Sequence, residues 1–318
     1  MTEQRLDITT QEWRLVAPAS ERTATEACEL CAVSGDAQHP TVVVIADPHA
    51  PIGRAGDDVT GRSSSIHSMT AATGSSEVVV HSGAHGERLG DMSDEQLALL
   101  VDVWAARYAD LSARAGVAYV FVHADCGGPA DKFEGHAHGG IHAYGSVPPR
   151  PAQELRIAAA HLVHTGRCVV CDVVAQERAD GLRVIAQNRH FVAYVPFAAR
   201  HPYEVHIAAH RHATSLLDLT QPERASLGNV LRTVAGAYDA LTDGQAAWAM
   251  AMHQAPVDDG ESLPIAHLHV EFVLVHPGEA LIPDLGAVAL GAGVAVHSRP
   301  PGEVAAELRA AVARRSSL

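Results

Sequence analysis

The apolar and polar positions of the chain form two similar blocks. Residues 77–93 read EVVVHSGAHGERLGDMS, and residues 204–220 read EVHIAAHRHATSLLDLT. In each block a glutamate opens an apolar run typical of a strand, a histidine follows eight residues later, and a hydroxyl residue follows eight residues after the histidine. Because such self-similarity marks a repeated structural unit, we interpret the chain as a duplication.

Each block leads into a predicted helix. Ser93 and Thr220 begin the pattern of a capping box, and Pro222 suits the first turn of a helix. Apolar residues then recur at helical spacing in both copies: Leu97, Leu100, Val101, Trp104, Leu227, Val230, Leu231 and Val234. A further apolar segment follows each helix, at 118–125 and 246–254, and predicts a strand.

These elements predict an α+β fold built from two tandem repeats. We place the repeats at residues 1–155 and 156–318, each a mostly antiparallel sheet with a long helix packed on it. The sheets of the two copies are expected to pair and to form one half-barrel-like sheet. A chain of 318 residues, 47% of them hydrophobic, is large enough to bury such a core.

The charge balance excludes some classes of function. The chain carries 37 acidic and 23 basic residues, a formal net charge of −14. Nucleic-acid-binding surfaces need clustered Lys and Arg, so we expect no nucleic-acid partner. No apolar run approaches the roughly 20 residues of a membrane helix, and the polar N-terminus has no signal-peptide pattern. We therefore expect a cytoplasmic protein with no membrane partner.

Cysteine and histidine carry the candidate chemistry. Cys28 and Cys31 form one C-x-x-C pair, and Cys168 and Cys171 form a second. In a reducing cytoplasm such pairs are more often metal ligands than disulfides. The 21 histidines include a His-x-His motif after each of the two later strands: His136, His138, His267 and His269.

The His-x-His spacing has a structural meaning. In a strand, residues i and i+2 face the same side, so the two imidazoles of each motif are expected to project together. Two adjacent imidazoles suit metal ligation or nucleophilic attack on phosphorus. The alternative is a pair of surface histidines on a loop, which the recurrence of the motif in both repeats disfavours.

The segments around these motifs resemble a known family. GHAHGGIHAYGSVPP (135–149) is similar to the active-site segment of galactose-1-phosphate uridylyltransferases, a branch of the histidine-triad superfamily, and AHLHVEF (266–272) is similar to the matching motif of their second repeat. The resemblance implies that His138 is the nucleophile. It would attack the α-phosphorus of a UDP-sugar, form a uridylyl-histidine and pass the group to a second sugar 1-phosphate. It also implies a homodimer.

The resemblance further implies two metal sites. A zinc site near the nucleophile would use four ligands, Cys28, Cys31, His85 and His136. Two thiolates and two imidazoles are also a zinc pattern by residue type and order alone. A second metal, iron or zinc, would lie on Glu154, His253, His267 and His269.

The second C-x-x-C pair has two interpretations. Cys168 and Cys171 either bind a further metal with His212, by analogy with the first repeat, or are buried small residues left from the duplication. His142 is interpreted as a framework or surface histidine rather than a site residue.

The phosphate-binding part of the sequence departs from the family pattern. The glutamine two residues after the nucleophile is replaced by Gly140, a loop serine by Phe133, a loop asparagine by Asp125, and the proline between the histidines by Ala137. Losing one hydrogen-bond donor to the transferred group can slow such a reaction on the order of 100-fold. Asp125 would repel a phosphate unless it is protonated or bound to a metal.

Other substrate contacts differ as well. Gly127, Gly128 and Pro129 precede the motif; a glycine there lets backbone N–H groups approach a phosphate, and an ordinary turn is an equally good interpretation. We retain Gly127, Asp125 and Gly140 as predicted substrate-binding positions. The family's hexose-binding Glu and Gln fall on Val288 and Val294, and its N-terminal arginines are poorly matched around residues 20–23.

The sequence therefore predicts a nucleotidyltransferase that acts on a nucleotide-sugar and a sugar 1-phosphate, most closely of the hexose-1-phosphate uridylyltransferase type. One alternative is a related hydrolase or phosphorylase that passes the nucleotidyl group to water or inorganic phosphate. Another is a non-catalytic relative that binds a nucleotide or metal. Retention of His138 favours an enzyme.

Overall fold

The structure is a computed structural model. It describes residues 3–10, 12–16, 28–35, 39–47, 50, 52, 64, 66–127, 133, 135–257, 260–275, 292–296 and 298–315. Val288 and residues 17–27, which include the poorly matched segment 20–23, lie outside these ranges, as do Gly128 and Pro129.

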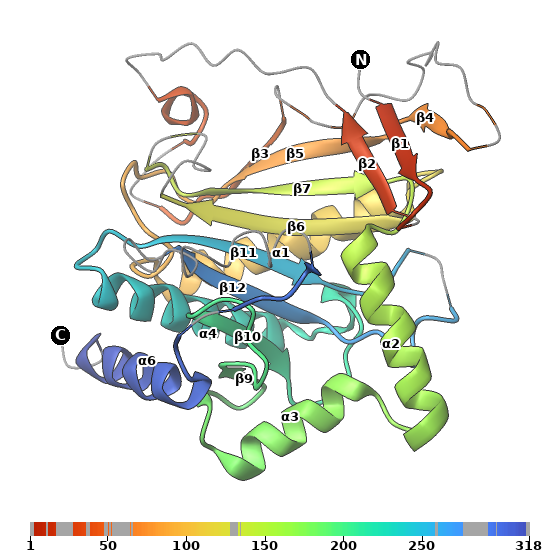
Figure 1. Ribbon diagram of the computed structural model, residues 1–318. Helices are drawn as coiled ribbons and strands as arrows, with labels where there is room; N and C mark the ends of the chain where they lie inside the picture. The colour runs from red at the N-terminus through yellow and green to blue at the C-terminus, as the bar shows by residue number, and fades with distance from the viewer. Residues whose placement is uncertain are drawn as a thin grey trace.

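A nine-stranded antiparallel sheet forms the centre of the protein (Figure 1). Its strands, in spatial order, are β3 (Val43–Ala46), β5 (Gly74–Val80), β7 (His138–Tyr144), β6 (Tyr119–Cys126), β11 (Ala247–His253), β12 (His269–Val275), β10 (Glu204–Ala209), β9 (Phe191–Tyr194) and β8 (Val184–Gln187). A small second sheet consists of β2 (Glu12–Val16), β1 (Glu3–Asp7) and β4 (Met69–Ala71).

The order of the strands reflects the duplication. In the first copy the order is β5-β7-β6, and the second copy continues with β11-β12-β10, so that corresponding strands are arranged symmetrically about the β6–β11 pair. The predicted α+β class and the predicted joining of the two sheets are confirmed. The division at residues 155 and 156 stays a prediction, and it falls within one helix, α2 (Pro149–Thr165).

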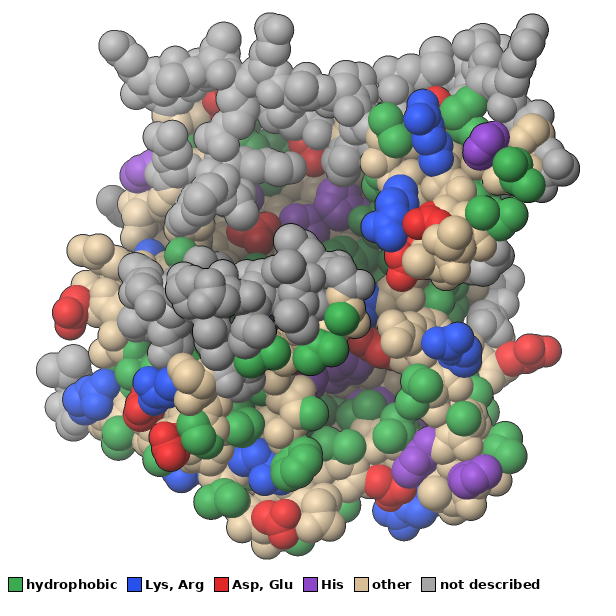
Figure 2. Space-filling view, in the orientation of Figure 1, with side chains coloured by type: hydrophobic (Ala, Val, Ile, Leu, Met, Phe, Trp, Pro, Cys, Tyr) green, Lys and Arg blue, Asp and Glu red, His purple; other side chains and the backbone are tan. Residues whose placement is uncertain are grey.

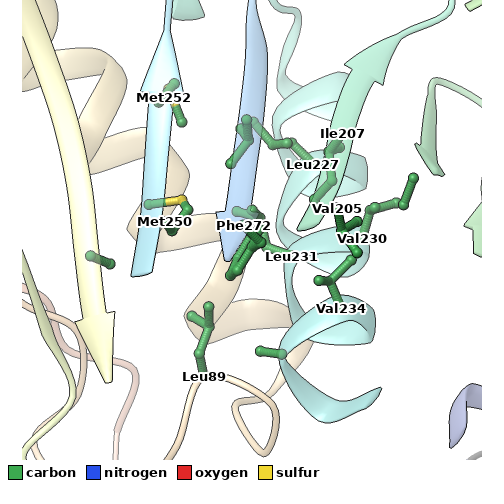
Figure 3. Packing of buried hydrophobic residues seen from close by; sticks show 14 of the residues in the cluster. Leu89, Val205, Ile207, Leu227, Val230, Leu231, Val234, Met250, Met252 and Phe272 are labelled. Carbon is green, nitrogen blue, oxygen red and sulfur yellow. The ribbon is translucent and has the colours of Figure 1, made fainter. Parts of the chain in front are cut away.

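Helices lie on both faces of the sheet. The other helices of the described residues are α1 (Asp94–Ser112), α3 (Val169–Asp180), α4 (Gln221–Leu241), α6 (Pro301–Arg315) and the short η1 (Glu29–Ala32) and η2 (Leu216–Asp218). Figure 3 shows Leu227, Val230, Leu231 and Val234 of α4 packed toward the sheet. On the opposite face Val174 of α3 packs against Val192, Tyr194 and Ala208.

Strand alternation separates a core face from a polar face. Ile141, Val122, Met252, Phe272 and Ile207 are buried in the core that α1 and α4 cover. The residues next to them in each strand point to the other side. That other side carries the polar groups His138, His123, Asp125, His253, His269 and Glu271. The fold therefore collects the candidate chemistry of four neighbouring strands on one face.

The predicted helix starts are confirmed, with one difference. The Ser93 hydroxyl accepts a hydrogen bond of 3.1 Å from the Gln96 N–H, and the Glu223 carboxylate accepts one of 2.8 Å from the Thr220 N–H. The Gln96 side chain does not return to Ser93. It donates to the carbonyl oxygens of Thr41 and His81 and thereby ties the start of α1 to the sheet edge.

No single helix among the described residues is long and apolar enough to cross a membrane. Only α2 and α3 taken together, which meet at a bend of 78°, reach that length and composition.

Candidate active site and metal centres

His138 begins β7 and is buried. Its Nδ1 lies 2.8 Å from the carbonyl oxygen of His136. Because a carbonyl oxygen can only accept, the proton must be on Nδ1, and Nε2 of the neutral ring keeps its lone pair. The Phe133 ring packs edge-on against the imidazole, with 4.8 Å between ring centroids. In its neutral form, an imidazole oriented in this way is suited to attack phosphorus.

The first cysteine–histidine cluster lies beside this histidine. Cys28 is the N-cap of η1, Cys31 lies within η1, His85 follows β5, and His136 precedes β7. Their ligand atoms all lie within 4.8 Å of one another. The His136 Nδ1 is 3.6 Å from Cys28 Sγ and 3.5 Å from Cys31 Sγ. The His85 Nδ1 is 3.5 Å from Cys31 Sγ.

These distances fit a zinc ion. Zn–S and Zn–N bonds of about 2.3 and 2.05 Å at tetrahedral angles separate sulfur from nitrogen by about 3.6 Å. The His136 Nε2 donates to the Ser82 carbonyl at 2.9 Å, which presents Nδ1 to the cysteines and fixes the ring. Burial and the neighbouring Cys28 raise the pKa of the Cys31 thiol, so a cation is needed to hold both sulfurs as thiolates.

A second cluster repeats this geometry in the other half of the chain. Cys168 and Cys171 flank the start of α3, and the His267 Nδ1 lies 3.7 and 3.4 Å from their sulfurs. The His212 Nδ1 is 3.6 Å from Cys171 Sγ, and its Nε2 donates to the Leu263 carbonyl at 2.9 Å. Burial and Cys168 raise the pKa of the Cys171 thiol to about 12. The arrangement supports the metal-site interpretation of this pair.

His267 therefore does not lie where the family resemblance implied. It was expected with Glu154, His253 and His269, but its Nδ1 faces the two cysteine sulfurs instead. The same-face argument for His-x-His is wrong for a simple reason. His136 and His267 precede the strands, which begin at His138 and His269, so each motif divides its histidines between a cysteine cluster and the sheet face.

The remaining second-metal residues gather with a different fourth partner. Glu154, His253, His269 and Glu271 bring their ligand atoms within 4.8 Å of one another. The His253 Nδ1 is 2.6 Å from a Glu154 oxygen, and the His269 Nε2 is 3.9 Å from oxygens of both glutamates. Burial and the neighbouring His253 lower the pKa of His269 to about 4, so its ring is neutral, as a ligand must be.

Arg150 ties this acidic cluster together. Its guanidinium lies 2.7 Å from both oxygens of Glu271 and 3.1 Å from Glu154. The cluster lines a cavity of about 880 Å³ whose wall also includes apolar residues of α2 and α3 and the exposed Phe197. In the view of Figure 2, histidine and acidic side chains gather in two recesses of the surface.

Two of the three predicted substrate-binding positions lie near His138 in the sheet. Asp125 is directly opposite His138 in the pairing of β6 with β7, and Gly140 is two residues further along β7. Gly127 has a φ of +65°, and a Cβ there would lie 3.0 Å from the Ala246 carbonyl oxygen. This backbone conformation alone accounts for a glycine. Val294 is half exposed.

Three functional candidates were missed by the sequence reasoning. Glu271 could have been found, because it stands two residues after His269 in the same strand. His123 could have been found only from the pairing of β6 with β7, which places it opposite Gly140. Arg150 had no sequence signal, since its importance comes from the approach of α2 to β12.

Comparison with known proteins identifies relatives along most of the chain. Residues 52–148 match the N-terminal domain, and residues 154–279 the C-terminal domain, of galactose-1-phosphate uridyl transferase. The galactose-1-phosphate uridylyltransferase of Thermotoga maritima is 28% identical over 316 residues, 97% of this chain and 98% of the relative. That of Streptomyces lividans is 34% identical over 218 residues, 65% of this chain and 60% of the relative.

Solved structures agree with these matches. A structure described as uridylyltransferase superposes with a TM-score of 0.87 at 27% identity and covers 98% of this chain and 99% of its own. An ADP-glucose phosphorylase from Arabidopsis thaliana with bound ADP-glucose superposes with a TM-score of 0.73 at 22% identity, over 97% of this chain and 99% of its own, which shows a shared fold. By its two domain matches and its full-length relative, the chain belongs to the galactose-1-phosphate uridylyltransferase family.

Proposed function

We propose that this protein transfers a nucleotidyl group through a covalent adduct on His138, in a reaction of the UDP-glucose–hexose-1-phosphate uridylyltransferase type. The observation that carries the proposal is the 2.8 Å hydrogen bond from the His138 Nδ1 to the His136 carbonyl. It holds the ring in the tautomer whose Nε2 can attack, at the position of the family's nucleophile.

Two displacements at phosphorus make up the reaction. In the first, the Nε2 lone pair forms a bond to the α-phosphorus, and the bond from that phosphorus to the sugar 1-phosphate oxygen breaks, with the electron pair leaving on the sugar phosphate. In the second, a phosphate oxygen of the acceptor attacks, and the P–N bond breaks. The acceptor is already an anion, so His138 needs no separate base.

The cysteine clusters would hold zinc as structural ions. Cys28, Cys31, His85 and His136 would fix the loop that presents His138, and Cys168, Cys171, His212 and His267 would do the same for His269. The Glu154, His253, His269 and Glu271 cluster would hold iron or zinc, because carboxylate and imidazole together suit either metal. A bound zinc ion would supply positive charge that keeps the thiols ionised.

The proposed substrate class is taken from the names of the relatives. The Thermotoga and Streptomyces proteins are named for galactose 1-phosphate, so a UDP-sugar and a hexose 1-phosphate are the first substrates to test. The protein is proposed to act in the cytoplasm as a homodimer, and light scattering on the purified chain would test the dimer.

A phosphorylase of nucleotide-sugars is the second candidate function. An ADP-glucose phosphorylase from Arabidopsis thaliana is 24% identical over 234 residues, 73% of this chain. The replacement of the phosphate-contacting pattern by Phe133, Asp125 and Gly140 favours an altered donor or acceptor. Inorganic phosphate would then take the place of the sugar 1-phosphate in the second displacement.

Intact-mass spectrometry tests both functions. Metal-replete protein is mixed with UDP-glucose, UDP-galactose, ADP-glucose or diadenosine tetraphosphate. A gain of one UMP or AMP that is absent from His138→Ala would support the proposal and name the nucleotide. Release of that adduct by galactose 1-phosphate, or by inorganic phosphate, would separate transferase from phosphorylase. Nucleotide binding without any adduct would contradict both functions and favour a non-catalytic relative.

A further inference from the structure

The imidazole of His123 occupies the space that a side chain at position 140 would need. The two residues face each other across β6 and β7. A Cβ on Gly140 would lie 2.4 Å from the His123 Nε2 and 3.0 Å from its Cε1. A glutamine at position 140 therefore cannot coexist with this position of His123. In this chain the volume next to Gly140 is filled by the imidazole of His123 from the neighbouring strand.

His123 lies in a hydrogen-bonded chain along the polar face. Its Nδ1 is 3.3 Å from an Asp125 carboxylate oxygen, and its Nε2 is 3.0 Å from the His142 Nε2. The His142 Nδ1 is 2.7 Å from the Ser76 hydroxyl. The rings of His123 and His142 stack, with centroids 4.8 Å apart. His142, interpreted from sequence as a framework or surface residue, is thus a buried member of this chain.

Asp125 creates an electrostatic problem. It is the direct partner of His138 in the strand pairing, so the two side chains lie on one face with Cβ atoms about 5 Å apart. An ionised carboxylate without a counter-charge at that distance would repel the anionic phosphoryl group that His138 must approach. The site needs either a neutral carboxyl group or a counter-charge beside it.

We propose that His123 is a positioning residue that shares a proton with Asp125, so that the pair opposite His138 presents no net negative charge to the phosphate of a bound nucleotide. The Asp125–His123 pair thereby replaces two neutral amides of the family pattern. The inference rests on the proposed function for the identity of the reacting group, and on the geometry alone for the phosphate contact.

The hydrogen-bond chain can accommodate the shared proton. With His123 protonated, Nδ1–H donates to Asp125, Nε2–H donates to the His142 Nε2, and the His142 Nδ1–H donates to Ser76. Among the residues that the structure describes, the titratable groups hydrogen-bonded to His123 are Asp125 on its own strand and His142 on β7, and the buried His81 also interacts with it electrostatically. Ala251, its register partner on β11, is uncharged. The acidic member of the set is therefore Asp125.

Two matched variants test the pair. His123→Asn keeps a side-chain N–H that can reach Asp125 but cannot carry the proton, and His123→Asn/Asp125→Asn also removes the negative charge. His123→Ala serves as a second single variant, and His164→Ala, an exposed position on α2, is the control. Calorimetry measures the affinity of each metal-replete protein for UMP and AMP, and for uridine and adenosine, which lack the phosphate.

The expected result is specific to the phosphate. His123→Asn should weaken nucleotide binding about tenfold and leave nucleoside binding within about twofold, and the double variant should recover most of the loss. Adduct formation on His138 should slow about 100-fold in the single variants and recover in the double variant. His164→Ala should behave as the unmodified protein does.

Two results would overturn the inference: nucleotide binding unchanged in both single variants, or a double variant as weak as His123→Asn. Both results can be measured in a protein without catalytic activity, because the binding measurement needs no adduct. Failure of the protein to form an adduct on His138 would instead contradict the proposed function, and the nucleotide-to-nucleoside ratio would still decide the role of His123.

Discussion

The Nδ1 of His269 lies 2.9 Å from the carbonyl oxygen of His267, in the same relationship that joins His138 to His136 at 2.8 Å. Both repeats therefore hold the second histidine of His-x-His in one tautomer. The surroundings differ, because Glu154 and Glu271 face His269. Carboxylates repel a phosphate and attract a cation, so one geometry supports two kinds of chemistry.

We predict that only His138 carries the nucleotidyl adduct. His138→Ala should abolish the added mass after incubation with the donor, whereas His269→Asn should retain it, because the acidic surroundings of His269 exclude a phosphoryl group. Peptide mapping of the adduct identifies the modified residue. An adduct on residue 269, or one that survives in His138→Ala, would contradict the assignment of the nucleophile.

We predict that the two cysteine clusters bind zinc independently. Each has sulfur–nitrogen distances of 3.4–3.7 Å, near the value for a tetrahedral zinc ion. Cys31→Ser and Cys171→Ser should each lose about one zinc per chain and lower the melting temperature by about 5 °C or more, since metal binding is linked to folding.

Inductively coupled plasma mass spectrometry gives the zinc content of these variants. Cys126→Ser is the matched control, because Cys126 belongs to neither cluster. Loss of both zinc ions from one single variant would show that the clusters are not independent. Unchanged zinc content in Cys171→Ser would favour the alternative in which the second pair is a remnant of the duplication.

We predict that Arg150 contributes most to the free energy of unfolding when the acidic cluster holds no metal. Glu271 is 8% exposed and accepts two hydrogen bonds of 2.7 Å from Arg150. Arg150→Met removes the two shortest hydrogen bonds of this carboxylate, leaves it Arg200 and His206 at 3.3 Å, and should cost about 1–3 kcal/mol in metal-free protein. A metal on Glu154, His253, His269 and Glu271 would replace part of the lost charge, so the loaded variant should lose less.

Urea unfolding with and without added Zn²⁺ or Fe²⁺ measures this difference. Chelated and loaded samples of the unmodified protein provide the reference. An equal loss of unfolding free energy in both states would indicate that the cluster is an ion-pair network and not a metal centre.

We predict that burial of His81 contributes to acid sensitivity. Burial, followed by the charge of the nearby His138, lowers the pKa of His81 to about 3 in the folded protein. The unfolded chain binds this proton near pH 6.5. Between these values the unfolded state holds more protons, so the free energy of unfolding falls as the pH falls, by at most about 1.4 kcal/mol per pH unit.

His81→Asn removes the titrating group and should reduce this slope between pH 7.5 and pH 5. Parallel urea titrations of both proteins across that range are the measurement. Stability curves that stay parallel from pH 7.5 to pH 5 would show that His81 is protonated equally in both states.

Much of the architecture was determined by local patterns in the sequence. The strands at 119–126 and 247–253 and the helices beginning after Ser93 and Thr220 follow from alternation, helical spacing and capping, which act between neighbours a few residues apart. The grouping of Cys28, Cys31, His85 and His136 also followed from residue type and order. The duplication suggested a matching set at Cys168, Cys171 and His212 as one of two interpretations, and the fourth member, His267, came only from the structure.

Only the tertiary structure decided which partner each site residue has. His267 joins the cysteine cluster because it lies before β12 and faces the cysteines at the start of α3. Glu271 takes the place beside His269 that was expected for His267. His123 fills the space above Gly140 because β6 pairs with β7 in one register. Local patterns state which face of a strand a residue occupies, but the identity of its neighbour depends on strand order and register, which involve segments far apart in the chain.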